Sequence, residues 1–256
     1  MKDLMFFDAG CRIGNQMNAP GCTAADLLKL MDQAGIDKAL VAHNGLTFAP
    51  QTTNSLICKE IAVCPERLKG VWCMLPQQCP EFPSADTLFD EMHANGICAL
   101  TLEPFEHRYV PCRLSLGKIM DAAAERKVPI LLENFSVHWE NPNTKWEELY
   151  RFMAEFPKNT YIFRAIYGKW GIDRQIRPLL ENYAGFHFAL SGYWVPEGIR
   201  DLAEIYGAER LLFATGYPVF NHGNQMLQLK YSGLPDDAVA KIAGQNMERI
   251  LKEAQV

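Results

Sequence analysis

The sequence predicts an α/β fold, a (β/α)8 TIM barrel with an extra helix at its C-terminal end. Short apolar segments bounded by turn residues alternate along the chain with segments of helical spacing. Parallel strands require such helices, because each crossover must return the chain to the same end of the sheet. The length of 256 residues also matches the usual size of this barrel.

Eight apolar segments are the predicted strands, and they are almost continuously apolar instead of alternating with polar residues. That pattern indicates a parallel sheet buried on both faces. The segments span residues 4–9, 38–43, 69–75, 97–103, 129–133, 160–165, 186–191 and 210–215. An open doubly wound sheet is the alternative, but such sheets normally have fewer strands. No glycine-rich dinucleotide-binding pattern follows the first segment either.

The predicted helices carry leucine-type residues about three and four positions apart. They span residues 23–35, 55–67, 84–96, 115–127, 145–157, 173–185, 196–208 and 223–233. The expected N-caps are Thr23 and Ser84, and the glycines expected to end helices in the left-handed conformation are Gly35, Gly96, Gly185 and Gly207. Residues 235–255 begin with acidic and end with basic side chains, which predicts the extra helix that closes the barrel.

No linker rich in proline or serine divides the chain, so the sequence predicts a single domain over residues 1–256. The longest polar insertion, residues 135–144, follows the fifth strand. It is expected on the face where barrels of this kind build their active sites.

Composition limits the partners. The chain has 25 basic and 30 acidic residues, a net charge of -5, and no basic cluster, which argues against nucleic acid and anionic membrane surfaces. No stretch approaches the roughly eighteen apolar residues of a membrane span, and the short apolar run before Asp8 is not expected to be a signal peptide. We expect a small anionic molecule as partner. We also expect a homodimer, because dimers are the commonest oligomers of soluble proteins.

The eight cysteines lie in the first half of the chain and include no C-x-x-C pair. This pattern is typical of reduced thiols and predicts a cytoplasmic protein. Cysteines inside apolar runs, such as Cys73 in GVWCML, are interpreted as small buried hydrophobic residues. His107, by contrast, is expected to be an exposed loop residue.

Five segments resemble, in order and spacing, the signatures of the amidohydrolase superfamily. They are FFDAGCRIG (6–14), AVCPERLKGVWCMLP (62–76), ALTLEP (99–104) with AAAERKVPILLE (122–133), FPKNTYIFRAIYG (156–168) and LLFATGYP (211–218). The sequence most resembles the amidohydrolase-related branch, which contains metal-dependent hydrolases and decarboxylases on a (β/α)8 barrel. The resemblance implies hydrolytic chemistry as a class and no particular substrate.

The chain departs from this family where the family binds its metal. The positions that match the family's metal ligands are Gly10, Arg12, Glu133, Ala165 and Gly216. Of these five, only Glu133 has a side chain that coordinates metal ions. We therefore expect no metal and no other cofactor. A metal site built from Cys11, His43 and Glu133 is the less favoured alternative.

The substitutions place charged residues at strand ends that share one mouth. Arg12 and Arg164 are predicted to bind an anionic substrate through bidentate hydrogen bonds. Glu133 is the leading candidate for acid/base catalysis, because its apolar surroundings and a nearby arginine act on its pKa in opposite directions. The alternative is a structural ion network of Arg12, Glu133 and Arg164.

Further candidates lie at or just after other strand ends. His43 and Glu103 are predicted to take part in proton transfer. Asn134, Tyr193 and Tyr217 are predicted to contact the substrate, with Trp194 as part of an aromatic wall; packing is the alternative role for these rings.

These observations favour a metal-independent hydrolase that acts on a lactone, an ester or a similar small anionic substrate. The first alternative is a non-catalytic relative that binds a ligand or has a role in assembly. A metal-dependent hydrolase with relocated ligands is the least favoured. The first two differ in whether Arg12, Glu133 and Arg164 point into an open pocket or pair with one another.

Overall fold

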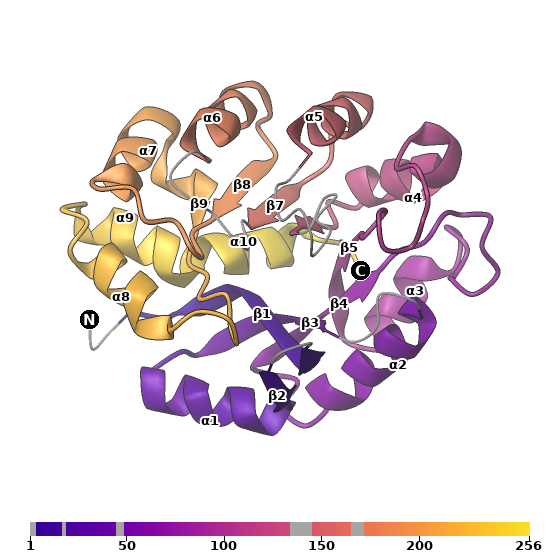
Figure 1. Cartoon of the computed structure of the whole chain (residues 1–256), viewed down its shortest axis with the longest axis horizontal. Helices are drawn as coiled ribbons and strands as arrows, with labels where there is room; N and C mark the ends of the chain where they lie inside the picture. The colour runs from indigo at the N-terminus through magenta and orange to yellow at the C-terminus, as the bar shows by residue number, and fades with distance from the viewer. Residues whose placement is uncertain (1–3, 17–18, 45–48, 134–144, 165–171) are drawn as a thin grey trace.

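The computed structural model describes residues 4–16, 19–44, 49–133, 145–164 and 172–256. The described residues contain eight parallel strands that lie next to one another in chain order (Figure 1). They are β1 (Phe7–Gln16), β3 (Lys38–His43), β4 (Leu68–Cys73), β5 (Ile97–Thr101), β6 (Ile130–Leu132), β7 (Tyr161–Arg164), β8 (Phe186–Ala189) and β9 (Leu211–Leu212). The predicted α/β barrel fold is confirmed.

The first strand differs most from its predicted bounds. β1 was expected over residues 4–9 but continues to Gln16, because β2 (Ala19–Cys22) folds back and pairs antiparallel with its far end. The register of β1 against β3 shifts between Asp8 and Cys11, which marks a bulge. The strand period of two therefore changes phase within β1.

Hydrogen bonds join the first strand to the segment that follows the last strand. The Ala9 N–H donates to the Phe213 carbonyl at 2.9 Å. Asp8, only 1% exposed, accepts hydrogen bonds from the N–H groups of Gly10 and Thr215 at 3.0 Å each, and from the Thr215 hydroxyl. The curled sheet is thus closed by backbone bonds and by one buried carboxylate.

The helices cover the outside of the curled sheet (Figure 1). They are α1 (Ala24–Ala34), α2 (Pro50–Ile61), α3 (Leu88–Ala94), α4 (Arg113–Glu125), α5 (Trp146–Glu155), α6 (Asp173–Asn182), α7 (Gly198–Tyr206) and α8 (His222–Lys230). α2 begins at Pro50, well before the predicted start, because proline fits the first helical turn.

The helix ends confirm some sequence signals and contradict others. Thr23 caps α1 in a reciprocal capping box with Asp26, and Gly35 ends this helix with φ of 72°. Ser84 does not cap α3, which begins at Leu88. Gly185 ends no helix either. A Cβ at this position would lie 2.5 Å from the Asn159 carbonyl oxygen, so close packing of two backbones explains the glycine.

The other two predicted helix-ending glycines are only partly confirmed. Both Gly96 and Gly207 have positive φ values, 69° and 93°. Asn95, however, is the residue that caps the end of α3, so Gly96 lies one position beyond. Gly207 directly follows α7, but its ψ of 138° is not that of a left-handed helical residue.

Mostly small and branched apolar side chains fill the interior of the barrel. The inner cluster comprises Phe7, Ala9, Leu40, Ala42, Val71, Ala99, Leu131, Ile162, Ala189, Leu212, Ala214, Met247 and Ile250. Side chains two positions apart on a strand point the same way. Residues two positions beyond the inner cluster, such as Cys73, Glu133 and Arg164, therefore point towards the open end of the barrel.

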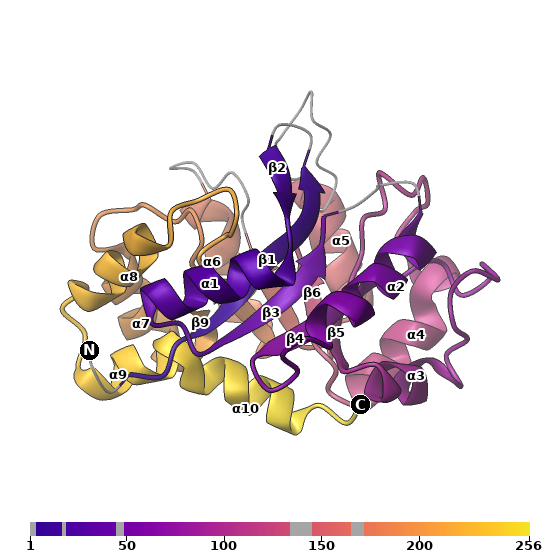
Figure 2. The same ribbon diagram turned by 90° about the horizontal axis from the view of Figure 1, so that it is seen from below.

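The predicted C-terminal helix is confirmed and forms the floor of the barrel. It consists of α9 (Asp236–Ala240), a π-helical turn (Lys241–Gln245) and α10 (Asn246–Glu253). Met247 and Ile250 of α10 join the inner cluster. Figure 2 shows α9 and α10 at the opposite end of the molecule from β2, so the carboxyl ends of the strands stay uncovered by this segment. No described helix is long and apolar enough to cross a membrane.

His187 on β8 makes the stability of the fold depend on pH. This histidine is 5% exposed, and burial, with Arg210 and Arg249 nearby, lowers its pKa from 6.5 to about 4. The folded state therefore holds the neutral ring, while the unfolded state takes up a proton below about pH 6.5. We expect the free energy of unfolding to fall by up to about 3 kcal/mol between about pH 6.5 and pH 4.

Urea unfolding across this range measures the effect. His187→Gln should flatten the pH dependence, because glutamine takes up no proton. An unchanged slope in the variant would assign the dependence to another group.

A candidate active site at the carboxyl ends of the strands

Four predicted residues meet at one end of the barrel. Arg12 lies on β1, Glu103 and Glu133 lie just beyond β5 and β6, and Arg164 ends β7. Arg12 Nε donates to Glu133 Oε2, and Arg12 Nη2 donates to Glu103 Oε1 at 2.8 Å. Arg164 Nε lies 2.6 Å from Glu133 Oε1. We call Arg12, Glu103, Glu133 and Arg164 the arginine–glutamate network.

The network is more buried on its Glu133 side than on its Glu103 side. The side chains of Glu133 and Arg164 are 0% and 4% exposed, whereas those of Arg12 and Glu103 are 10% and 14% exposed. Burial alone would raise the pKa of Glu133, but the two arginines outweigh burial and lower it. Burial alone would lower the pKa of Arg12, but Glu133 and Glu103 raise it. Glu133 and Arg12 are therefore both charged at neutral pH.

This geometry bears on the predicted acid/base role of Glu133. Both carboxylate oxygens are paired with arginines, and the lowered pKa makes the carboxylate a weak base that does not donate a proton near pH 7. Arg164 also donates from Nη1 to the Gly10 carbonyl at 2.8 Å. Glu133 is thus better placed to orient two guanidinium groups than to transfer protons.

His43 ends β3 beside Arg12. Its ring is half-buried and packs so closely on Gly14 that a Cβ there would lie 2.5 Å from the ring; Gly14 also has a positive φ of 96°. Burial lowers the pKa of His43, and Arg12 lowers it further, against the opposing effect of Glu60. The imidazole is neutral at pH 7 and can accept a proton.

Two of the three residues predicted to contact the substrate, Tyr193 and Tyr217, lie in different surroundings. Tyr193 is 1% exposed, and its hydroxyl donates to Asp173 on α6 at 2.5 Å, so the structure places this ring in packing under the β8–α7 connection. Tyr217 lies beside the network, because its carbonyl accepts from the Arg12 N–H at 2.9 Å. Burial and a hydrogen bond with Cys22 raise the pKa of Tyr217. Asn134 lies outside the described residues.

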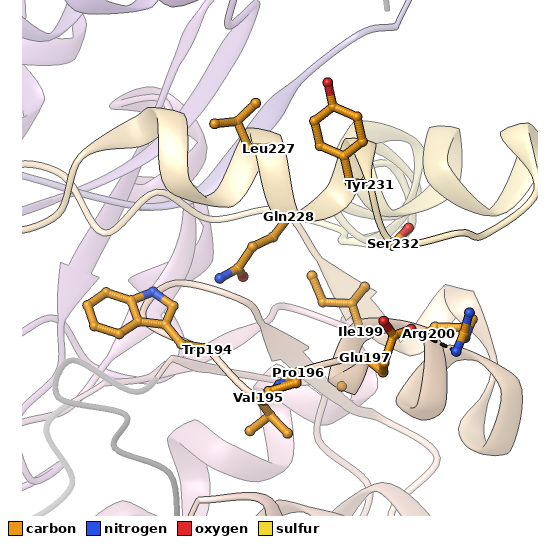
Figure 3. A pocket seen from close by; sticks show the side chains of 11 residues that line it. Trp194, Val195, Pro196, Glu197, Ile199, Arg200, Leu227, Gln228, Tyr231 and Ser232 are labelled. Atoms are coloured by element: carbon orange, nitrogen blue, oxygen red, sulfur yellow. Dashed lines mark ion pairs between the residues drawn. The ribbon is translucent and has the colours of Figure 1, made fainter.

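Trp194 lines a separate cavity of about 380 Å³ between the β8–α7 connection and α8 (Figure 3). Leu227 and Gln228 of α8, and Tyr231 directly after this helix, lie across the cavity from Pro196 and Ile199. No residue of the arginine–glutamate network contributes to its lining. Trp194, which was predicted to line the barrel mouth, therefore lines this separate cavity.

The residues at the barrel mouth do not fit the metal ion that the resemblance implies. Both oxygens of Glu133 are paired with arginines, and both oxygens of Asp8 accept hydrogen bonds. A Cβ at Gly10 would lie 2.5 Å from Arg164 Cδ, so the arginine fills the space of a side chain at this matched ligand position. Within the described ranges, no three His, Cys, Asp or Glu side chains form a metal-binding group.

Cys11 does not join His43 and Glu133 in a site. It belongs to the outer cluster, with Ile13 and Leu27, between the sheet and the helices. Burial, followed by the charge of Asp8, raises the pKa of its thiol well above the usual value. Cys11, His43 and Glu133 therefore do not face one common point, as the alternative metal site would require.

The sequence interpretation missed a second polar pair at the same end of the barrel. Cys73 ends β4 and is partly exposed, and its Sγ lies 3.8 Å from Nδ1 of the half-buried His107. The available signal was strand period: Cys73 follows the inward-facing Val71 by two positions. Because its neighbours in sequence are apolar, Cys73 was interpreted as a buried hydrophobic residue instead.

The sequence profile of the family described as amidohydrolase matches residues 14–252. No curated protein matches the sequence significantly. An uncharacterized TIM-barrel protein from Bordetella bronchiseptica has a TM-score of 0.73 at 18% identity, covering 98% of this chain and 99% of that chain. The 2,6-dihydroxybenzoate decarboxylase from Rhizobium has a TM-score of 0.72 at 17% identity, covering 97% and 99%.

A third solved structure has a TM-score of 0.67 at 14% identity and covers 96% of this chain and 99% of that chain. It is a probable 2-pyrone-4,6-dicarboxylic acid hydrolase from Acinetobacter baumannii with citric acid bound. At such identities the structural likeness shows the TIM-barrel fold alone. The family profile, however, spans most of the sequence and confirms the resemblance seen in the strand-end motifs. The chain belongs to the amidohydrolase family.

Proposed function

We propose that this protein hydrolyses a small anionic substrate, such as a lactone or an ester, without a bound metal ion. The observation that carries the proposal is the pair of buried guanidinium groups that converge on Glu133 where the family holds its metal. Guanidinium groups bind carboxylates through paired hydrogen bonds and stabilise developing negative charge.

The charge balance of the network explains how an anion binds. Arg12 and Arg164 carry one more charge than Glu133 neutralises, and Glu103 supplies the balance at the more exposed end. A substrate carboxylate that replaces Glu103 at Arg12 preserves this balance. The released Glu103 carboxylate and the neutral His43 are then the groups available for proton transfer.

Two of the similar structures support the choice of substrate class. The names of these proteins refer to dihydroxybenzoate and to a pyrone dicarboxylic acid, which are both small carboxylates. The sequence-based expectations of a single domain, a homodimer, a cytoplasmic location and no nucleic-acid or membrane partner stay predictions.

A non-catalytic relative is the second candidate. The mutual ion pairing of Arg12, Glu133 and Arg164 favours it, because a buried network of paired charges can fill the barrel mouth without binding a substrate. On this reading the barrel binds an anion or serves an assembly role without turnover.

A substrate panel of carboxylated lactones and esters separates these possibilities. We expect turnover that survives dialysis against a chelator, and a metal content well below one ion per chain by elemental mass spectrometry. Arg12→Lys keeps the charge but loses the paired geometry, so its KM should rise on the order of tenfold. Arg151→Lys, at a 72% exposed side chain on α5, is the matched control.

Each contrary result identifies another function. Turnover that disappears on chelation and returns with added metal would establish a metal-dependent hydrolase. Saturable binding of small carboxylates without turnover would establish the non-catalytic relative.

A further inference from the structure

We propose that Cys73 and His107 are the nucleophile and the base of a covalent route for this hydrolysis. The inference rests on the proposed function and specifies its chemistry. The side chains lie 3.8 Å apart, Sγ to Nδ1, beside the arginine–glutamate network.

The fold holds Cys73 at the barrel mouth. Asn54 of α2 fixes the end of β4: its Nδ2 donates to the Cys73 carbonyl at 2.9 Å, and its Oδ1 accepts from the Cys73 N–H at 2.8 Å. Cys73 shares the inward-facing side of β4 with Val71. Its sulfur therefore points to the space bordered by Glu103 and Arg12.

His107 is placed by the first turn after β5. Its N–H donates to the Glu103 carbonyl at 3.0 Å, which returns the chain towards β4. The Glu103 backbone lowers the pKa of the neighbouring Cys73 thiol, against the larger effect of burial. Glu103 thus acts on the Cys73 thiol and pairs with Arg12 through its carboxylate.

The protonation states suit a neutral pair. Burial, followed by the charge of Glu103, raises the pKa of Cys73, against the opposing effect of Arg12. Burial lowers the pKa of His107, although Glu103 opposes this shift. A thiol and a neutral imidazole face each other at pH 7, so the imidazole is free to take the proton as the sulfur attacks.

The reaction balances with water as the only co-reactant. Cys73 Sγ attacks the acyl carbon while its proton moves to His107, and the Arg12 guanidinium holds the substrate anion. The C–O bond to the leaving oxygen breaks, and that oxygen takes the proton from His107. Water then attacks the thioester, releases the acid and restores the thiol.

The other cysteine considered at this end of the barrel is excluded by position. Cys11 faces the helices in the outer cluster, next to Asp8. Cys64 lies before β4, at the amino end of the strand whose carboxyl end holds Cys73. Cys64→Ser is therefore a matched control for Cys73→Ser.

Acetyl transfer from p-nitrophenyl acetate tests the pair directly. We expect peptide mass spectrometry to find the acetyl group on Cys73, and His107→Gln to slow its formation on the order of 100-fold. Cys64→Ser should leave that rate unchanged. In the substrate panel, Cys73→Ala and Cys73→Ser should each lower turnover by roughly 100-fold or more.

The outcomes separate the two proposals. Panel turnover that persists in Cys73→Ala overturns the covalent route and leaves metal-independent hydrolysis standing. Acetylation of Cys73 that is unaffected by His107→Gln also overturns the pair. His107-dependent acetylation without turnover of any panel substrate supports the pair and contradicts the proposed hydrolysis.

Discussion

Replacing Glu133 with alanine is expected to lower the free energy of unfolding by about 3–5 kcal/mol. The side chain is fully buried between two arginines that are themselves 10% exposed or less. Removal of the carboxylate leaves Arg12 and Arg164 close together in a poorly solvated site, with Glu103 as the remaining partner. Uncompensated buried charge is among the largest penalties that a single substitution causes.

Chemical denaturation measures this loss. Glu147→Ala on α5 is the control, because Glu147 is 84% exposed in its pair with Arg151 and should change stability by no more than about 0.5 kcal/mol. The triple variant Arg12→Met, Glu133→Leu, Arg164→Met should be more stable than Glu133→Ala, since it removes the three most buried charges together and leaves only Glu103, the most exposed member of the network. A loss below about 1 kcal/mol in Glu133→Ala would contradict the buried network.

The ion pairing of Glu133 with Arg12 and Arg164 also makes stability depend on pH. The pKa of Glu133 is lower in the folded protein than the usual glutamate value of 4.5, because the two arginines outweigh the effect of burial. Its contribution to stability is therefore complete above about pH 4.5 and is lost as the pH falls through the folded pKa. This window lies below the one assigned to His187. The stability difference between the wild type and Glu133→Gln should shrink only at the acidic end.

Asp8→Ala is expected to be the second most damaging change, with a loss of about 3 kcal/mol or more. Its carboxylate accepts from the N–H groups of Gly10 and Thr215 and from the Thr215 hydroxyl, and it is 1% exposed. The substitution leaves these three donors buried without their acceptor. It also removes the side chain that ties β1 to the segment after β9.

Thr215→Val gives a graded comparison for Asp8→Ala. It removes only the hydroxyl, which also accepts from the Tyr217 N–H at 3.1 Å, and should cost about 1–2 kcal/mol. Hydrogen exchange should show faster opening of the Ala9 N–H in Asp8→Ala than in the wild type. Equal protection of Ala9 in both proteins would show that closure does not depend on this carboxylate.

Strand identity follows from the sequence, because burial on both faces leaves a continuous apolar run that few other elements produce. Each predicted strand overlaps an observed one, as for residues 38–43, which match β3 residue for residue. β1 was mispredicted at its far end because its partner β2 is a short segment with no apolar pattern. The predicted N-cap Ser84 was wrong, because the geometry of the preceding loop, which the sequence does not show, sets the start of α3 at Leu88.

The site was predictable only in part. Strand ends placed Arg12, Glu133 and Arg164 at one mouth, and the structure brings these residues into contact. Their pairing depends on side-chain direction, which sequence does not specify. Cys73 was overlooked because its apolar neighbours in sequence say nothing about which side chain approaches it from the turn after β5, here His107. Tyr193 was misjudged for the same reason, since Asp173 lies on another element.

The close approach of Arg164 to Gly10 constrains how this barrel can change over generations. A histidine introduced at Gly10 alone collides with Arg164, because even its Cβ would lie 2.5 Å from Cδ of that side chain. Loss of Arg164 first removes a charge partner from the buried Glu133. Either order of single steps passes through an impaired intermediate. The two positions are thus expected to be epistatic, so that a histidine at Gly10 requires Arg164 to change with it.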